Sequence, residues 1–129
     1  MPKINTSSIG MRAEYLAKKF LEHKNYKILE SNFFNKFGRR LGEIDIIAQK
    51  NNELIFIEVK SRILKNNNLT IIPEENITYT KLHKLNKIAS FYISKNNLWH
   101  KAYHFDSISV ELNSSMECIN LKHLKDIFL

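Results

Sequence analysis

Residues 42–62 read GEIDIIAQKNNELIFIEVKSR, and this stretch decides the fold of the chain. It contains two runs rich in β-branched and aromatic residues, 43–49 and 53–60, with the pair Asn51-Asn52 between them. Such runs predict strands, and asparagine tolerates the positive φ angles of a two-residue type I′ turn. The segment therefore predicts a tight antiparallel β-hairpin.

The turn also predicts the register of the hairpin. With Asn51-Asn52 at its tip, apolar residues oppose one another on one face: Ile44 with Val59, Ile46 with Ile57, and Ala48 with Ile55. A slip of one residue would move every side chain to the other face and break this agreement. The pattern therefore predicts that this face is buried.

The opposite face of the hairpin carries charge. The same register places Asp45 across from Glu58 and Glu43 across from Lys60, beside the apolar pair Ile47 and Phe56. Directly opposed side chains have Cβ atoms roughly 5 Å apart. At an effective dielectric constant of about 20, two carboxylates at that separation repel by about 3 kcal/mol. Lys60 or a bound cation has to offset this repulsion.

Two acids and one lysine suit phosphodiester hydrolysis. Mg²⁺ prefers carboxylate oxygens, polarises a phosphoryl oxygen and lowers the pKa of its bound water. Lys60 could orient or deprotonate that water, or stabilise the charge that develops on phosphorus. The alternative interpretation is a solvated strand face with ordinary ion pairs, and the hairpin alone leaves both open.

The remaining sequence predicts further helices and strands around the hairpin. We expect a helix over residues 8–24, a strand over 26–34, an irregular loop over 64–73, a helix over 80–95, and strands over 102–112 and 117–121. The order α-β-β-β-α-β-β predicts an α/β fold with a mixed β-sheet flanked by helices. No composition shift marks a boundary, so residues 1–129 are expected to form one domain.

Composition excludes several classes of protein. Of the 129 residues, 43% are hydrophobic and 26% charged, with three glycines and two prolines, which excludes collagen and a long disordered tail. The single cysteine, Cys118, excludes an intrachain disulfide framework and a Cys-rich zinc module, and it is expected to be buried. With no secretory signal or run of about 20 apolar residues, the protein is expected to be cytoplasmic, with no membrane partner.

The charge balance points to a polyanionic partner. Twenty basic residues against thirteen acidic ones give a net charge of +7, which favours nucleic acid ahead of a membrane surface. Arg39 and Arg40 precede the hairpin and could hold backbone phosphates. On the second predicted helix, Lys81, Lys84 and Lys87 form either a solvated face or a phosphate-contacting one.

The histidines and the single tryptophan could serve either chemistry or packing. His100 and His104 are four apart, but on a predicted strand this spacing is wide, so no metal role is expected. The other histidines are expected at the surface. Trp99 is expected to be core or partly buried rather than a platform for base stacking.

Residues 42–48, GEIDIIA, and 56–62, FIEVKSR, resemble the signature of the YraN family. These small bacterial proteins are predicted endonucleases of the restriction-endonuclease-like, PD-(D/E)xK superfamily. The resemblance extends over most of the chain, through residues of both helices and of an early and a late strand: Gly10, Glu14, Ala17, Asn32, Lys81, Ala89, Phe105 and Asp106. The chain departs from the family at His104, where an arginine is usual, at Asn25, where a glycine is usual, and in the loop after Arg62.

The resemblance implies a restriction-endonuclease-like fold and assigns roles to its motif residues. Asp45 and Glu58 would bind Mg²⁺ or Mn²⁺, the carbonyl of Val59 would add a ligand, and Lys60 would be the catalytic lysine. Glu14 resembles the first-helix acid that completes the site in junction-resolvase-like members. The expected nucleic-acid contacts come from basic residues: Arg39, Arg40, Arg62, Lys81 and Lys84.

The expected function is therefore metal-dependent endonucleolytic hydrolysis of DNA, with repair or recombination as the setting. Cleavage of both strands by one small site would favour a homodimer. The first alternative is a non-catalytic nucleic-acid-binding module that keeps the nuclease fold. The second is an adaptor protein whose acids and lysine form only an ion-pair network.

Overall fold

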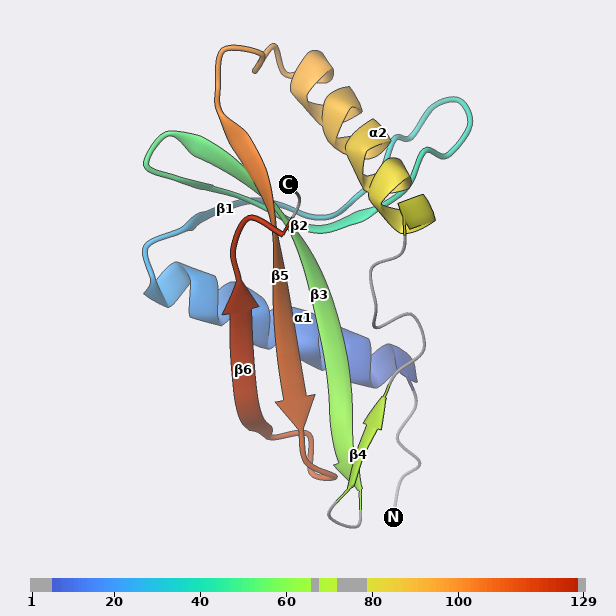
Figure 1. The fold of residues 1–129 in the computed structure, drawn as a ribbon, viewed down its shortest axis with the longest axis vertical. Helices are drawn as coiled ribbons and strands as arrows, with labels where there is room; N and C mark the ends of the chain where they lie inside the picture. The colour runs from blue at the N-terminus through green and yellow to red at the C-terminus, as the bar shows by residue number, and fades with distance from the viewer. Residues whose placement is uncertain (1–5, 66–67, 72–78, 128–129) are drawn as a thin grey trace.

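The computed structural model describes residues 6–65, 68–71 and 79–127. Their elements follow the order α1 (Thr6–His23), β1 (Lys27–Phe33), β2 (Ile44–Lys50), β3 (Glu53–Lys65), β4 (Asn68–Ile71), α2 (Tyr79–Lys95), β5 (Tyr103–Leu112) and β6 (Cys118–Leu124). The strands form one sheet in the order β1-β2-β3-β5-β6, and β4 pairs with β3 (Figure 1). Only β3 and β5 run parallel among these pairs, so the sheet is mixed and the predicted α/β class is confirmed.

The hairpin forms with the predicted turn and register. Asn51 and Asn52 have φ angles of 51° and 65°, as a type I′ turn requires. The ladder between β2 and β3 contains the predicted pairs Ile46–Ile57, Ile47–Phe56 and Ala48–Ile55. The alternation of side chains between the two faces of the hairpin therefore predicted the register near the turn, and the structure confirms it.

The register departs from the prediction at the charged end of the hairpin. The β2–β3 ladder stops at Ile46, so the predicted pairs of Ile44, Asp45 and Glu43 lie outside it. Instead, the backbone N–H of Val59 donates a hydrogen bond of 2.8 Å to Asp45 Oδ2. Ile44 is paired with Phe33 of β1 and packs on the opposite face of the sheet from Ile46. At this end of the β2–β3 ladder, the side chain of Asp45 therefore accepts the hydrogen bond of a β3 backbone N–H.

The predicted irregular loop over residues 64–73 is wrong for its described residues, 64–65 and 68–71, which all lie in strands. β3 continues to Lys65, and Asn68–Ile71 forms β4, antiparallel to it. Ile63 is buried in the core beside α1, so apolar burial carries β3 beyond the charged motif. Residues 66–67 and 72–73 lie outside the described residues.

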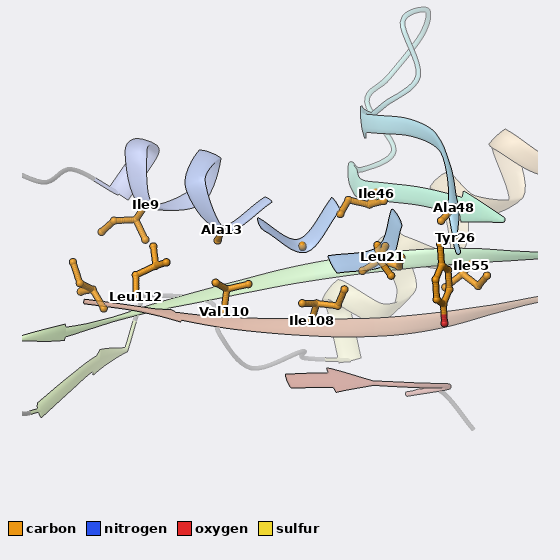
Figure 2. Packing of buried hydrophobic residues seen from close by; sticks show 13 residues of the cluster. Ile9, Ala13, Leu21, Tyr26, Ile46, Ala48, Ile55, Ile108, Val110 and Leu112 are labelled. Carbon is orange, nitrogen blue, oxygen red and sulfur yellow. The ribbon is translucent and has the colours of Figure 1, made fainter. Parts of the chain in front are cut away.

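Each face of the sheet has its own apolar core. Against α1, Ala13 and Leu21 pack on residues of the central strands such as Ile57 and Ile108 (Figure 2). Against α2, Ile88 packs with Phe56. Because the face that carries Phe56 is covered by a helix, the polar residues near it lie at the border of a core and not on a solvated sheet.

Two expectations for single residues are wrong. Cys118 is exposed, because it begins β6 at the edge of the sheet. Trp99 is 65% exposed in the turn that follows α2.

Within the described ranges, no helix is both long and apolar enough to cross a membrane.

Candidate functional site

Asp45 lies in β2, at the point where the β2–β3 ladder ends. Its Oδ2 accepts the hydrogen bond from the Val59 N–H, which holds the carboxyl against β3. Burial, and after it the negative charge of Glu58, raises the pKa of Asp45 from 3.8 to about 7. The hydrogen bond from Val59 opposes this rise but does not cancel it. At neutral pH, Asp45 is therefore poised between its charged and neutral forms.

Glu58 projects from β3 on the face covered by α2. Its residue is 8% exposed, and its Oε1 lies 2.6 Å from Nζ of Lys81, which is in the first turn of α2. The expected phosphate-contacting lysine thus forms an ion pair with one of the two predicted metal-binding acids. Sequence spacing carries no signal for this contact, because it depends on how α2 docks on the sheet.

Lys60 follows Glu58 by two residues on β3 and is partly buried. Burial lowers the pKa of Lys60; the charge of Glu58 opposes this shift, and the charges of Lys81 and Arg62 reinforce it. Its ammonium is therefore easier to deprotonate than that of a solvated lysine. Its predicted partner Glu43 is engaged elsewhere, with Glu43 Oε2 lying 3.0 Å from Arg40 Nη2.

Glu14 of α1 lies near the same acids. Its Oε1 accepts a hydrogen bond of 2.8 Å from Asn32 Nδ2, so β1 holds the carboxyl in place. Burial raises the pKa of Glu14, and the charge of Glu43 adds to that rise. The negative charge of Glu14 in turn contributes to the raised pKa of Asp45. The helix acid therefore shares an electrostatic environment with the hairpin acids.

The predicted nucleic-acid residues lie on three segments around these acids. Arg39 and Arg40 are exposed in the loop between β1 and β2, and the Arg40 guanidinium lies 4.4 Å from the centre of the Phe34 ring. Arg62 lies half-buried on β3 beyond Lys60, and Lys84 is exposed one turn after the start of α2. The cations thus come from a loop, a strand and a helix.

The donor set is suited to a hard divalent cation. The carboxylates of Asp45 and Glu58 and the carbonyl of Val59 are oxygen donors, which Mg²⁺ and Mn²⁺ prefer. Burial, and after it repulsion from Glu58, raises the pKa of Asp45, and a dication would relieve that repulsion. In the described part of the chain, no group of three or more His, Cys, Asp or Glu residues is arranged to hold a metal ion.

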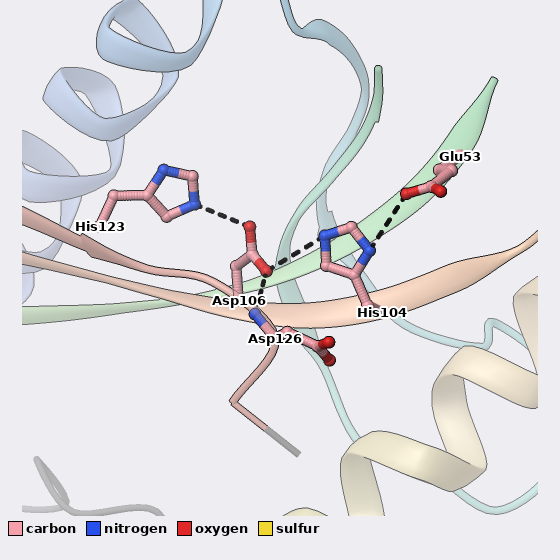
Figure 3. Close-up of polar contacts among 5 residues, drawn as sticks. All are labelled: Glu53, His104, Asp106, His123 and Asp126. Atoms are coloured by element: carbon pink, nitrogen blue, oxygen red, sulfur yellow. Dashed lines mark hydrogen bonds and ion pairs between the residues drawn. The ribbon is translucent and has the colours of Figure 1, made fainter. Parts of the chain in front are cut away.

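A second polar cluster lies on β5, where the resemblance singled out Asp106 and His104 but predicted no contact between them. Asp106 is fully buried, with His123 Nε2 2.7 Å from its Oδ2 and His104 Nε2 3.3 Å from its Oδ1 (Figure 3). The N–H of Asp126 donates to the same carboxyl at 2.9 Å. His123 is therefore held inside and not at the surface as expected, because Asp106 needs partners where water is absent. The cluster ties β5 to β6 and to the segment after it.

Comparison with known proteins places the chain in a family. A family model described as "Uncharacterised protein family UPF0102" matches residues 13–110. A UPF0102 protein of Clostridium beijerinckii is 44% identical over 128 residues, which cover 99% of this chain and 98% of that protein. A UPF0102 protein of Caldanaerobacter subterraneus is 41% identical over 113 residues, 88% of this chain and 87% of the relative. The chain belongs to the UPF0102 family, which is YraN-like, as residues 42–62 predict.

Proposed function

We propose that the protein is a metal-dependent endonuclease that hydrolyses DNA phosphodiester bonds. The observation that carries this proposal is the pairing of the partly buried Asp45, whose pKa is raised, with the buried Glu58, beside a lysine whose pKa burial lowers. Perturbed pKa values of this kind concentrate at functional sites, because catalysis needs groups that titrate near working pH. A solvated ion-pair face would not raise the pKa of Asp45 in this way.

Each residue of the site has a distinct part in this proposal. Asp45, Glu58 and the Val59 carbonyl hold the cation, and Glu14 completes the acidic side of the site. When bound, Mg²⁺ or Mn²⁺ supplies Lewis-acid polarisation of the phosphoryl oxygen and a more acidic water. Lys60 orients that water or accepts its proton, and its lowered pKa suits it to proton transfer.

The surrounding charge supports a nucleic-acid substrate. The chain has a net charge of +7, and the predicted cations come from three segments that border the acids. Phosphate contacts from such residues position a polyanion without reading its sequence. We infer that the site acts on a DNA backbone in the cytoplasm. Cleavage of both strands would favour a homodimer.

A cleavage assay tests the proposal directly. Labelled linear, flap and four-way-junction DNA is incubated with Mn²⁺ and with wild type, Asp45→Asn, Glu58→Gln or the exposed control Glu22→Gln. We expect wild type and Glu22→Gln to cleave at least one substrate and the two site variants to be inactive. Full activity in Asp45→Asn or Glu58→Gln would contradict the role proposed for that residue.

A non-catalytic DNA-binding module is the second candidate function. The contact that favours it is the Lys81–Glu58 ion pair of 2.6 Å, because Glu58 already has a cationic partner. This alternative predicts salt-dependent DNA binding that needs no divalent cation and is unchanged by Asp45→Asn. Absence of cleavage on every substrate, with such binding retained, would favour it over the nuclease.

A further inference from the structure

The loop between β1 and β2, residues 34–42, exposes an aromatic ring among cations. Its sequence is FNKFGRRLG, with three basic residues and no acidic one. Phe37 is 89% exposed, and Lys36 and Arg39 on either side of it are also exposed. The loop therefore presents an exposed aromatic ring together with positive charge, the combination by which proteins bind single-stranded nucleic acid.

The loop is held in shape by one buried side chain. Asn35 is 6% exposed, and its Nδ2 donates to the carbonyls of Phe37 at 3.0 Å and Arg39 at 2.8 Å. Its Oδ1 accepts from the Leu41 N–H at 2.9 Å. Gly38 provides the left-handed turn, with φ of +79°. The loop is therefore organised internally, and the exposure of Phe37 follows from that organisation.

The loop is also fixed next to the candidate site. At its end, a Cβ on Gly42 would come within 3.2 Å of the carbonyl oxygen of Lys84, so the glycine eases the close approach of the loop to α2. Arg40 forms its ion pair with Glu43, two residues before Asp45. Figure 1 shows the loop projecting from the sheet beside α2. The base of the loop is therefore held next to the acids of the candidate site.

We propose that residues 34–42 form a preformed base-stacking element, in which Phe37 stacks on an unpaired base while Lys36 and Arg39 contact the flanking phosphates. The inference rests on the proposed function, because it takes DNA as the partner. An aromatic ring interleaved with cations matches single-stranded nucleic acid, where every base offers a π-face and every linkage a negative charge. In a continuous duplex the π-faces are covered by stacking, so the substrate class is DNA with unpaired bases near the scissile bond.

Binding without catalysis tests this inference. With a chelator present, fluorescence anisotropy measures the affinity of wild type, Phe37→Ala, Phe37→Trp and Trp99→Ala for blunt duplex, single-stranded and flap DNA. Trp99 is the matched control, since it is an exposed aromatic residue outside the loop. We expect Phe37→Ala to weaken binding to flap and single-stranded DNA by about 5- to 150-fold, the range for loss of one base–aromatic stack. Duplex affinity should change little, Phe37→Trp should retain binding, and Trp99→Ala should behave as wild type.

Several outcomes would overturn the inference. Wild-type affinity in Phe37→Ala, an equal loss on duplex and flap DNA, or no DNA binding by wild type would each do so. The cleavage assay with Asp45→Asn keeps the two proposals distinguishable. A selective loss in Phe37→Ala with no metal-dependent cleavage leaves the loop inference standing and removes the nuclease. Normal binding by Phe37→Ala, with cleavage abolished by Asp45→Asn, leaves the nuclease proposal standing and removes the loop inference.

Discussion

Lys81 Nζ lies 2.6 Å from Glu58 Oε1, and this contact joins the first turn of α2 to the middle of β3. It gives the two acids of the hairpin different surroundings. Glu58 has a cation in direct contact, whereas Asp45 has a backbone N–H and a raised pKa. The site therefore combines Glu58, which has Lys81 as its cationic partner, with Asp45, whose pKa of about 7 lies close to neutral pH.

Replacing Lys81 tests whether the ion pair stands in for a metal. Lys81→Ala leaves the mostly buried Glu58 without this cation, so we expect a loss of about 1–3 kcal/mol in the free energy of unfolding. Mn²⁺ should restore more stability in Lys81→Ala than in wild type, because the dication takes over the charge. Thermal unfolding with and without Mn²⁺ measures both effects. Equal responses to Mn²⁺ in the two proteins would argue against a metal at Glu58, and the exposed Lys87→Ala serves as the helix control.

The raised pKa of Asp45 predicts how stability depends on pH. The folded protein binds the Asp45 proton more tightly than the unfolded chain, since the pKa rises from 3.8 to about 7 on folding. Stability from this group is therefore present at acidic pH and is lost as pH rises from about 4 through 7. Asn cannot ionise, and its side-chain oxygen can still accept from Val59. Metal-free Asp45→Asn should thus gain stability over wild type by an amount that grows from about pH 4 to pH 7 and approaches about 4 kcal/mol above it.

Urea unfolding at several pH values, with a chelator present, measures this gain. The exposed Glu22→Gln should keep the wild-type dependence, because Glu22 is not among the groups that shift the pKa of Asp45. A parallel pH dependence in Asp45→Asn and wild type would show that the Asp45 carboxyl titrates normally.

The hairpin could be predicted because its determinants are local. Positive φ at Asn51 and Asn52 and strict alternation near the turn fix the register of neighbouring residues. The same rule failed for Ile44, because the ladder with β3 ends at Ile46 and the Val59 N–H bonds to the Asp45 carboxyl, while β2 stays paired with β1. Alternation describes which residues share a face but not where a side chain interrupts the ladder.

The contacts between distant elements could not be predicted in this way. Lys81 reaches Glu58 only because α2 covers that face of the sheet, and His123 reaches Asp106 only because β6 pairs with β5. Nothing in the sequence links Lys81 to Glu58 or His123 to Asp106. The carboxylates indicated the polar sites better than their partners did, because a buried acid requires a polar partner, whichever element supplies it.

Lys60 provides a test of mechanism within the proposed function. Lys60→Ala should lower the DNA cleavage rate by about 10²–10⁴-fold, the range for loss of a general acid or base. Lys60→Arg separates proton transfer from charge stabilisation, because arginine keeps the charge but does not deprotonate. Partial rescue by Arg would indicate a charge role, and no rescue would indicate proton transfer. The exposed Lys95→Ala should cleave as wild type; unimpaired cleavage by Lys60→Ala would remove Lys60 from the mechanism.

Asn35 controls the shape of the β1–β2 loop. Asn35→Asp keeps the acceptor for the Leu41 N–H but loses both donors to the loop carbonyls, whereas Asn35→Ala loses all three hydrogen bonds. We expect Asn35→Ala to lower the free energy of unfolding by about 1–3 kcal/mol and to speed proteolysis within residues 34–42. Urea unfolding and limited proteolysis measure these changes. Unaltered proteolysis would mean that the loop keeps its shape without Asn35.

Asp106 joins three partners inside the protein, so its loss should be more damaging than loss of a surface acid. Asp106→Ala leaves the Asp126 N–H and the ring nitrogens of His104 and His123 without their common acceptor. We expect the free energy of unfolding to fall by about 2–4 kcal/mol, because buried donors lose their hydrogen bonds. Urea unfolding measures the fall, with Glu111→Ala on the same strand as the control. We expect the double variant His123→Ala/Asp106→Ala to lose less stability than the sum of the two single losses. Losses that simply add would show that the two side chains do not interact.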